Sequence, residues 1–90
     1  MSYDIELIET CGACPEQYDA FKNGVKVGYL RLRHGNFTVE CPDVGGQCVY
    51  STGNCRGDGA FKDDERGIFL ELAKQNIRLW LFLQERKADE

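Results

Sequence analysis

Apolar and polar residues alternate along the first half of the chain, with turn signals between the alternating runs. Because every second side chain of a strand faces the same side of a sheet, each run predicts a strand. Asn23–Gly24 separates the second run from the third and is the strongest short-range signal for a β-hairpin, and His34–Gly35–Asn36 predicts a further turn. The predicted strands are residues 3–9, 17–22, 25–33, 37–41 and 48–52.

The predicted hairpin register assigns side chains to the two faces of the sheet. Lys22 opposite Val25 sets Ala20 opposite Val27 and Tyr18 opposite Tyr29, and the same parity turns Cys41 toward the core. One face, expected to be the core, holds Phe21, Leu30, Leu32, Phe37 and Val39. The opposite, outer face is expected to hold Tyr18, Ala20, Val27, Tyr29, Arg31, Arg33, Thr38 and Glu40.

The last third of the chain carries a helical pattern over residues 64–86, and Asp63 or Asp64 is the expected N-cap. A polar stripe at helical spacing consists of Glu71, Lys74, Arg78 and Glu85. The rest of the helix is apolar over an arc of about 220°, which is wider than one sheet face covers. This excess predicts either a helix lying in a deep groove or a second chain that covers the remainder.

A homodimer through the helix is the favoured explanation, with Ile77, Trp80 and Leu81 at the interface. Residues 77–83 also alternate, which leaves a strand as the local alternative. Together the patterns predict one α+β domain over residues 1–90. It consists of an antiparallel β-meander of four to five strands packed against one long C-terminal α-helix, with a frayed tail at residues 87–90.

The 90 residues and the net charge of −4 restrict the class of protein. A chain of this length forms one domain. The acidic balance makes binding of nucleic acid or of an anionic membrane unlikely as a bulk property. Residues 1–10 lack the apolar run of a secretion signal, and the apolar run at residues 79–83 is too short to span a bilayer. We therefore expect a protein of the cytosol.

Five cysteines could serve as metal ligands, core thiols or a redox pair. Cys11-x-x-Cys14 has the spacing of half a zinc site, and Cys48 and Cys55 could complete it. A second closely spaced pair is missing from the sequence, so free thiols are the favoured interpretation and a structural zinc is the alternative. No other cofactor is expected.

The outer face carries the candidate binding residues Tyr18, Tyr29, Arg31 and Arg33, with His34 at the rim. Guanidinium groups beside aromatic rings bind carboxylates or phosphates and are enriched at protein interfaces. This pattern predicts either a protein interface or a nucleotide site. The alternative is a solvated face on which Arg31 pairs with Glu40 or Glu16 across strands.

Signals for catalysis are missing from the sequence. His34 is the single histidine, and no nucleophile is spaced to pair with it. Neither glycine-rich phosphate motif occurs. Residues 54–65 fit a calcium loop only superficially, because Arg56 occupies a ligand position. We expect no catalytic residues and a protein that is not an enzyme.

Three motifs carry a resemblance to a known group of proteins: Cys-Pro-Glu-Gln-Tyr-Asp at 14–19, Tyr-Leu-Arg-Leu-Arg-His-Gly at 29–35 with Phe37, and Gly-Asp-Gly-x-Phe at 57–61 with Glu65–Arg66. Over residues 11–77 the chain resembles small uncharacterised proteins encoded by phages and prophages of Gram-positive bacteria. The resemblance implies a non-catalytic accessory protein that binds and inhibits a host protein, as anti-defence or anti-CRISPR-like modules do. The alternatives are a protein that sequesters a nucleotide signal and a small zinc-stabilised nucleic-acid module.

Overall fold

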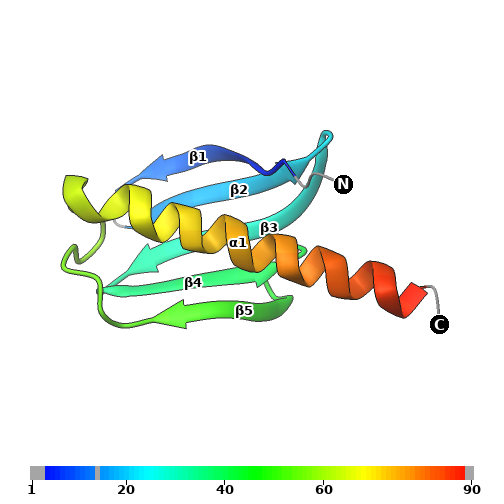
Figure 1. The fold of residues 1–90 in the computed structure, drawn as a ribbon. Helices are drawn as coiled ribbons and strands as arrows, with labels where there is room; N and C mark the ends of the chain where they lie inside the picture. Colours follow the sequence, from blue (N-terminus) through cyan, green and yellow to red (C-terminus); the bar gives the residue numbers. More distant parts are fainter. Residues whose placement is uncertain (1–3, 14, 89–90) are drawn as a thin grey trace.

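The computed structural model describes residues 4–13 and 15–88, which form one sheet and one helix (Figure 1). The sheet has the order β1-β2-β3-β4-β5, and each strand pairs antiparallel with the next. The predicted α+β meander is therefore confirmed, although the first strand begins and ends later than predicted. The elements are β1 (Glu6–Gly12), β2 (Glu16–Lys22), β3 (Val25–Arg33), β4 (Asn36–Cys41), β5 (Gln47–Thr52) and α1 (Asp63–Ala88).

Both predicted hairpin turns are present. Asn23 and Gly24 have φ angles of 52° and 80°, and His34 and Gly35 have φ angles of 54° and 75°. A two-residue turn of type I′ needs positive φ at both central positions, and its twist matches that of the flanking strands. The second turn consists of His34 and Gly35 alone, because Arg33 pairs with Asn36 across it.

A β-bulge between β2 and β3 changes the predicted register. Lys22 pairs with Val25 as predicted, but one step further along the hairpin the register shifts, and Ala20 pairs with Gly28 instead of Val27. A Cβ atom at Gly28 would lie 3.0 Å from a side-chain carbon of α1. Glycine therefore lets the bulged strand approach the helix more closely than another residue would allow.

The bulge brings into the core three residues that we expected on the outer face. Tyr18 pairs with Leu30 rather than Tyr29, and a one-residue slip exchanges the faces of a strand. The outer placement of Tyr18, Ala20 and Val27 is thus wrong, since all three are buried in the core. Phe21, expected in the core, is only partly buried. The core placement of Leu30, Leu32, Phe37, Val39 and Cys41 is confirmed.

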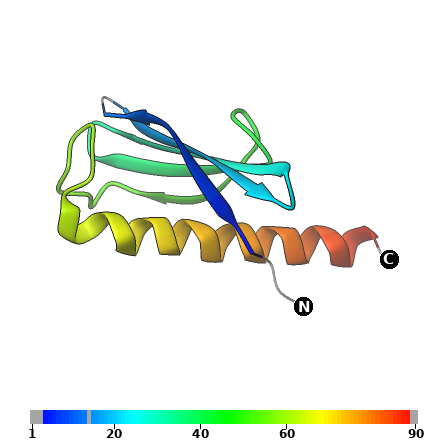
Figure 2. The same ribbon diagram turned by 90° about the horizontal axis from the view of Figure 1, so that it is seen from above.

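The helix and the sheet form two layers, with α1 covering one face of the sheet (Figure 2). Ala73 and Ile77 of α1 are fully buried against the strands. At the N-terminal end of α1, the ring of Phe37 lies 5.0 Å from the ring of Phe61 and 6.1 Å from that of Phe69, both in edge-to-face geometry. Such aromatic contacts add to the stabilisation that burial alone provides.

The start of α1 differs from the predicted N-cap. The Arg66 N–H donates to the carbonyl oxygen of Lys62 over 3.0 Å, so Lys62 occupies the capping position and the prediction of Asp63 or Asp64 is wrong. The Glu65 carboxylate accepts a hydrogen bond from the Lys62 N–H at 2.9 Å, as the acidic residue of a capping box does. Asp63 and Asp64 lie in the first turn, where negative charge suits the helix dipole.

The 26 residues of α1 make it longer than any strand. The helix runs diagonally across the sheet, and its C-terminal turns extend past the strands (Figure 1). The described part of the chain contains no helix that is long and apolar enough to cross a bilayer.

The predicted dimer residues differ in exposure. Ile77 is fully buried, so its assignment to a dimer interface is wrong. Trp80 and Leu81 are partly buried against the core, and their place at an interface stays a prediction. The alternative strand at 77–83 is wrong, because these residues belong to the helix. The large exposed apolar side chains of α1 are instead Ile68, Leu79, Phe82 and Leu83.

Candidate functional site

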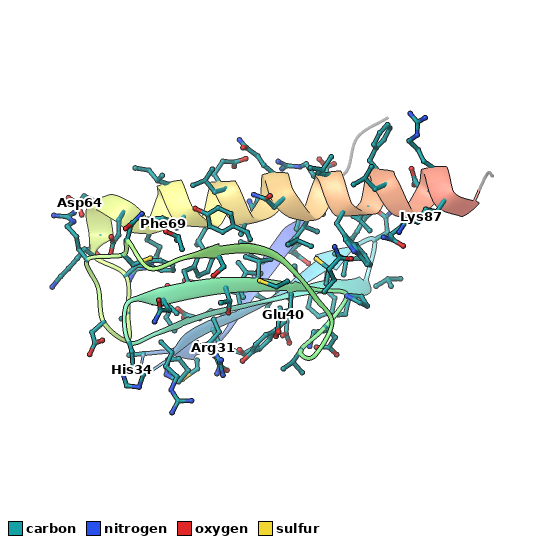
Figure 3. The ribbon with its side chains drawn as sticks, turned by 90° about the horizontal axis from the view of Figure 1, so that it is seen from below. Arg31, His34, Glu40, Asp64, Phe69 and Lys87 are labelled. Atoms are coloured by element: carbon teal, nitrogen blue, oxygen red, sulfur yellow. The ribbon has the colours of Figure 1, made fainter. Side chains whose placement is uncertain are left out.

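The sheet face opposite α1 is open, and it holds four of the five candidate binding residues. Arg31, His34 and Glu40 project from the side of the sheet that faces away from the helix (Figure 3). We call this surface the open face. It is built from two cross-strand rows and the turn beside them. The rows are Gln17–Arg31–Thr38 and Asp19–Tyr29–Glu40.

Arg31 and Arg33 have no ion-pair partner among the described residues. The register sets the neutral residues Gln17 and Thr38 on either side of Arg31. Glu40, one row away, accepts a hydrogen bond from the Gly45 N–H at 3.4 Å. The alternative in which Arg31 pairs with Glu40 or Glu16 is therefore wrong. The two guanidinium groups remain available to a ligand.

The other end of the open face is neutralised by internal ion pairs. The Lys26 ammonium lies 2.8 Å from a carboxylate oxygen of Asp43 and 3.0 Å from one of Asp19. These hydrogen bonds, first that of Asp43 and then that of Asp19, raise the pKa of Lys26. The same ammonium lies 5.9 Å from the centre of the Tyr29 ring. The unpaired positive charge of the open face is thus concentrated at the Arg31–His34 end.

A hollow of about 320 Å³ lies at this end of the sheet, lined by Pro15, Arg33, His34, Asp58 and Gly59. Two backbone hydrogen bonds hold its far wall: the Gly35 N–H donates to the Asp58 carbonyl, and the Glu16 N–H donates to the Gly59 carbonyl, each at 2.8 Å. The hollow can take a small anionic group beside the Arg33 guanidinium and the His34 imidazole, although the Asp58 carboxylate would oppose a high negative charge.

Tyr18 does not belong to the open face. Its side chain is 7% exposed, and its hydroxyl donates a hydrogen bond to the Glu16 carboxylate. Burial raises the pKa of Tyr18, and the hydrogen bond and charge of Glu16 raise it further. The hydroxyl therefore stays protonated as a structural donor. The predicted site loses one of its two tyrosines, and its register-based assignment is wrong.

Glu16 is a buried carboxylate that our sequence analysis did not identify as important. It accepts hydrogen bonds from the Phe61 N–H at 2.9 Å and from two nitrogens of Arg66 at 3.0 and 3.2 Å, besides that from Tyr18. Burial raises the pKa of this carboxyl, but the hydrogen bonds from Arg66, Tyr18 and Phe61 outweigh it, so the net shift is downward. Glu16 therefore stays ionised and joins the sheet to the start of α1.

Glu65 is the second buried carboxylate. Besides capping α1, it accepts hydrogen bonds from the N–H groups of Arg56 and Gly57, both at 2.8 Å. Burial raises its pKa, whereas the backbone hydrogen bonds of Lys62, Arg56 and Gly57 lower it and determine the net downward shift. Glu65 thus shapes the loop before the helix. No buried side-chain nitrogen or oxygen in the described residues lacks a hydrogen-bond partner, so both carboxylates are fully used in structure.

The cysteines do not come together as the zinc alternative requires. Cys11 lies in β1 and Cys48 in β5, at opposite edges of the sheet, and four strand spacings of about 4.8 Å separate these edges. The prediction that one zinc ion is bound by both Cys11 and Cys48 is therefore wrong. Cys14 lies outside the described residues, within which no three metal-ligating side chains cluster.

Two of the thiols are held in the protonated form by burial. Burial raises the pKa of Cys41 to about 12. Burial, together with the charge of Glu65, raises the pKa of Cys55 to about 11. A thiolate is the form that binds metals and reacts as a nucleophile, so neither side chain is poised for such chemistry.

Comparison of the chain with protein-family models, with curated proteins and with solved structures found no match. The open face offers a ligand the guanidinium groups of Arg31 and Arg33, the imidazole of His34 and the ring of Tyr29. All of them are carried by β3 and the turn that follows it.

Proposed function

We propose that the protein is a non-catalytic accessory protein of the phage-encoded type, which binds a host protein through the open face. The observation that carries this proposal is the pair Arg31 and Arg33, whose guanidinium groups have no ion-pair partner among residues 4–13 and 15–88 and lie on a sheet face that α1 leaves uncovered. A guanidinium fork binds carboxylates with two parallel hydrogen bonds. Because the sheet holds both residues in a fixed register, the backbone that carries them needs little further ordering when a partner binds.

The expected partner surface is acidic. Positive charge gathers at the Arg31–His34 end, whereas Lys26 is neutralised by Asp19 and Asp43. Arginine and tyrosine are the residue types that most often dominate binding energy at protein interfaces. The net charge of −4 of the whole chain disfavours a nucleic acid as partner, since binding to phosphates depends on overall charge neutralisation.

A nucleotide signal is the second candidate ligand, and the hollow beside Arg33 and His34 is the observation that favours it. A phosphate there would meet the guanidinium of Arg33 and the imidazole of His34. Tyr18, however, is buried on the opposite side of the sheet, which leaves the ring of Tyr29 beside the arginines to stack a base. We therefore rank the nucleotide below a protein partner.

The test compares the double variant Arg31→Glu/Arg33→Glu with the control Lys62→Glu/Lys74→Glu, which changes the net charge equally on the helix side. Tagged proteins are expressed in the host, and copurified proteins are quantified by mass spectrometry. We expect one acidic host protein to be recovered with the wild type and the control and lost with the arginine variant. Calorimetric titration with that purified protein should show at least a hundredfold loss of affinity, about 3 kcal/mol.

Equal recovery with the arginine variant would contradict the proposal. Unchanged thermal unfolding of both variants shows that the fold is intact. Native mass spectrometry of the untagged protein tests the second candidate, because a copurified nucleotide appears as an added mass that the arginine variant should lose.

A further inference from the structure

A second apolar stripe runs along α1 outside the core. Ile68, Leu79 and Leu83 are 62%, 55% and 45% exposed, and Leu72 is partly buried on the same side. At about 100° per residue these four side chains lie within an arc of about 60°, on the opposite side of the helix from Ile77. Exposed contiguous apolar surface of this kind marks an interaction site.

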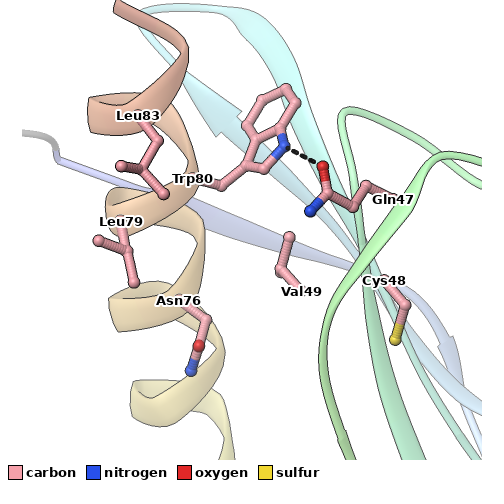
Figure 4. Close-up of a pocket in the computed structure, with 7 residues that line it drawn as sticks. All are labelled: Gln47, Cys48, Val49, Asn76, Leu79, Trp80 and Leu83. Atoms are coloured by element: carbon pink, nitrogen blue, oxygen red, sulfur yellow. Dashed lines mark hydrogen bonds between the residues drawn. The ribbon is translucent and has the colours of Figure 1, made fainter. Parts of the chain in front are cut away.

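The stripe continues into a groove between α1 and the edge strand β5 (Figure 4). Leu79 and Leu83 line this groove together with Asn76, Trp80 and the first residues of β5. The indole N–H of Trp80 donates to the Gln47 side-chain oxygen at 3.3 Å and closes one wall. The exposed apolar surface therefore reaches from the helix to the edge of the sheet.

The charges of α1 match an antiparallel copy of the same helix. Its last turn holds Arg86 and Lys87, and its first turn holds Asp63, Asp64 and Glu65. Glu65 is buried, whereas Asp63 and Asp64 are exposed and form surface ion pairs with Arg66 and Arg56. Antiparallel packing brings the acidic turn of one helix beside the basic turn of the other, whereas parallel packing brings like charges together. This complementarity selects a second copy of the chain, in antiparallel orientation, as the occupant of the stripe.

The spacing of the stripe agrees with a single twofold axis between Gln75 and Asn76. This axis sets Leu72 against Leu79 of the second copy. It also sets Ile68 against Leu83 and Asp64 against Lys87, so apolar residues meet apolar residues and the charges are opposite.

We propose that two copies of the chain form an antiparallel twofold dimer through Leu72, Leu79, Leu83 and Ile68 of α1. The homodimer expected from the sequence thus uses the side of α1 opposite to Ile77. The two helices then lie between the two sheets, and the two open faces point outward. The dimer does not depend on the proposed function and leaves Arg31 and Arg33 uncovered.

Sedimentation equilibrium of the full chain tests this dimer. The expected mass of the wild type is twice 10.2 kDa. Leu79→Glu/Leu83→Glu should give the monomer mass, and the control Ile8→Glu/Val25→Glu, at comparably exposed residues away from the stripe, should stay dimeric. A monomeric wild type at tens of micromolar, including one that binds only another protein through the stripe, would overturn the proposal. So would a dimer that survives the leucine substitutions.

Disulfide cross-linking tests the position of the axis. Gln75→Cys and Ile68→Cys are compared in the same background of native cysteines under mild oxidation. We expect a linked dimer with Gln75→Cys, which lies beside its own copy, and no linkage above the wild-type level with Ile68→Cys, which lies opposite Leu83. Linkage at both positions would indicate a parallel pair, and linkage at neither position or only at Ile68→Cys would likewise overturn the proposal.

Discussion

The two ends of α1 are attached to the sheet by different interactions. At the N-terminal end, Arg66 binds the buried carboxylate of Glu16, Glu65 binds three backbone N–H groups, and the ring of Phe37 is enclosed by other rings. At the C-terminal end, the indole N–H of Trp80 donates a hydrogen bond to Gln47 of β5, and the large apolar side chains Leu79, Phe82 and Leu83 are exposed. We call the N-terminal end of α1, whose polar groups and rings are enclosed, the closed end, and the C-terminal end, whose apolar side chains are exposed, the open end.

This difference indicates which groups serve the fold and which are available for binding. A buried carboxylate whose hydrogen-bonding capacity is fully used cannot also act on a substrate, so Glu16 and Glu65 belong to the structure. Burial of the exposed side chains of Leu79 and Leu83 in an interface, in contrast, would lower the free energy. The closed end should therefore determine the free energy of unfolding, and the open end should determine association.

The largest expected effect compares two phenylalanines in the two regions. Phe37 is 0% exposed and Phe82 is 44% exposed. Phe37→Ala leaves a cavity among the aromatic rings and should lower the free energy of unfolding by about 3–5 kcal/mol. Phe82→Ala should change it by less than about 0.5 kcal/mol at concentrations at which the wild type is monomeric. Urea denaturation monitored by circular dichroism measures both, and similar losses would refute the distinction between the ends.

A smaller effect is expected from two glutamates. Glu16→Gln keeps the shape of the side chain but removes the charge that binds Arg66 and presents an amide donor to groups that need an acceptor. We expect a loss of about 2–4 kcal/mol in the free energy of unfolding. The control variant is Glu71→Gln, because Glu71 is half exposed and pairs with Arg78 at 3.2 Å. The control should lose less than about 0.5 kcal/mol in the free energy of unfolding. Equal losses would show that Glu16 does not anchor the helix.

Local patterns predicted the elements of this fold but not the register of β2 against β3. Alternation and turn residues identify all five strands because these signals act over a few residues. The bulge at Gly28 moved Tyr18 to the core, and its only sequence signal was a glycine inside an alternating strand, which is compatible with either a bulge or a close approach. Register at such a position depends on how closely α1 can pack, which local sequence does not specify.

The candidate site was predictable where it depends on β3 alone. Tyr29, Arg31 and Arg33 alternate on one strand, and their common face follows from the period of two. The contacts of Glu16 with Phe61 and Arg66 span 45 and 50 residues of sequence, and no periodicity reports contacts over such separations. The excess apolar surface of α1 was likewise visible in the sequence. Its buried and exposed sides could be distinguished only once the sheet was in place.

The smallest expected effect is a difference in pH dependence, which isolates one carboxylate of the closed end. Glu16 and Glu65 have pKa values below the ordinary value of 4.5 in the folded chain. Their stabilisation is therefore fully present above about pH 4.5 and is lost as the pH falls toward the folded-state pKa, because only the unfolded chain takes up protons in that interval.

Glu16→Gln removes one of these two groups. The free energy of unfolding of the variant should fall less steeply below pH 4.5, by at most about 1.4 kcal/mol per pH unit. Asp43, whose pKa is lowered by its hydrogen bonds with Lys26 and the Val44 N–H, contributes equally to both proteins and cancels in the difference. Urea titrations at a series of pH values give the two slopes. Parallel curves would mean that Glu16 is protonated together with the unfolded chain and that its contacts with Arg66 do not depend on its charge.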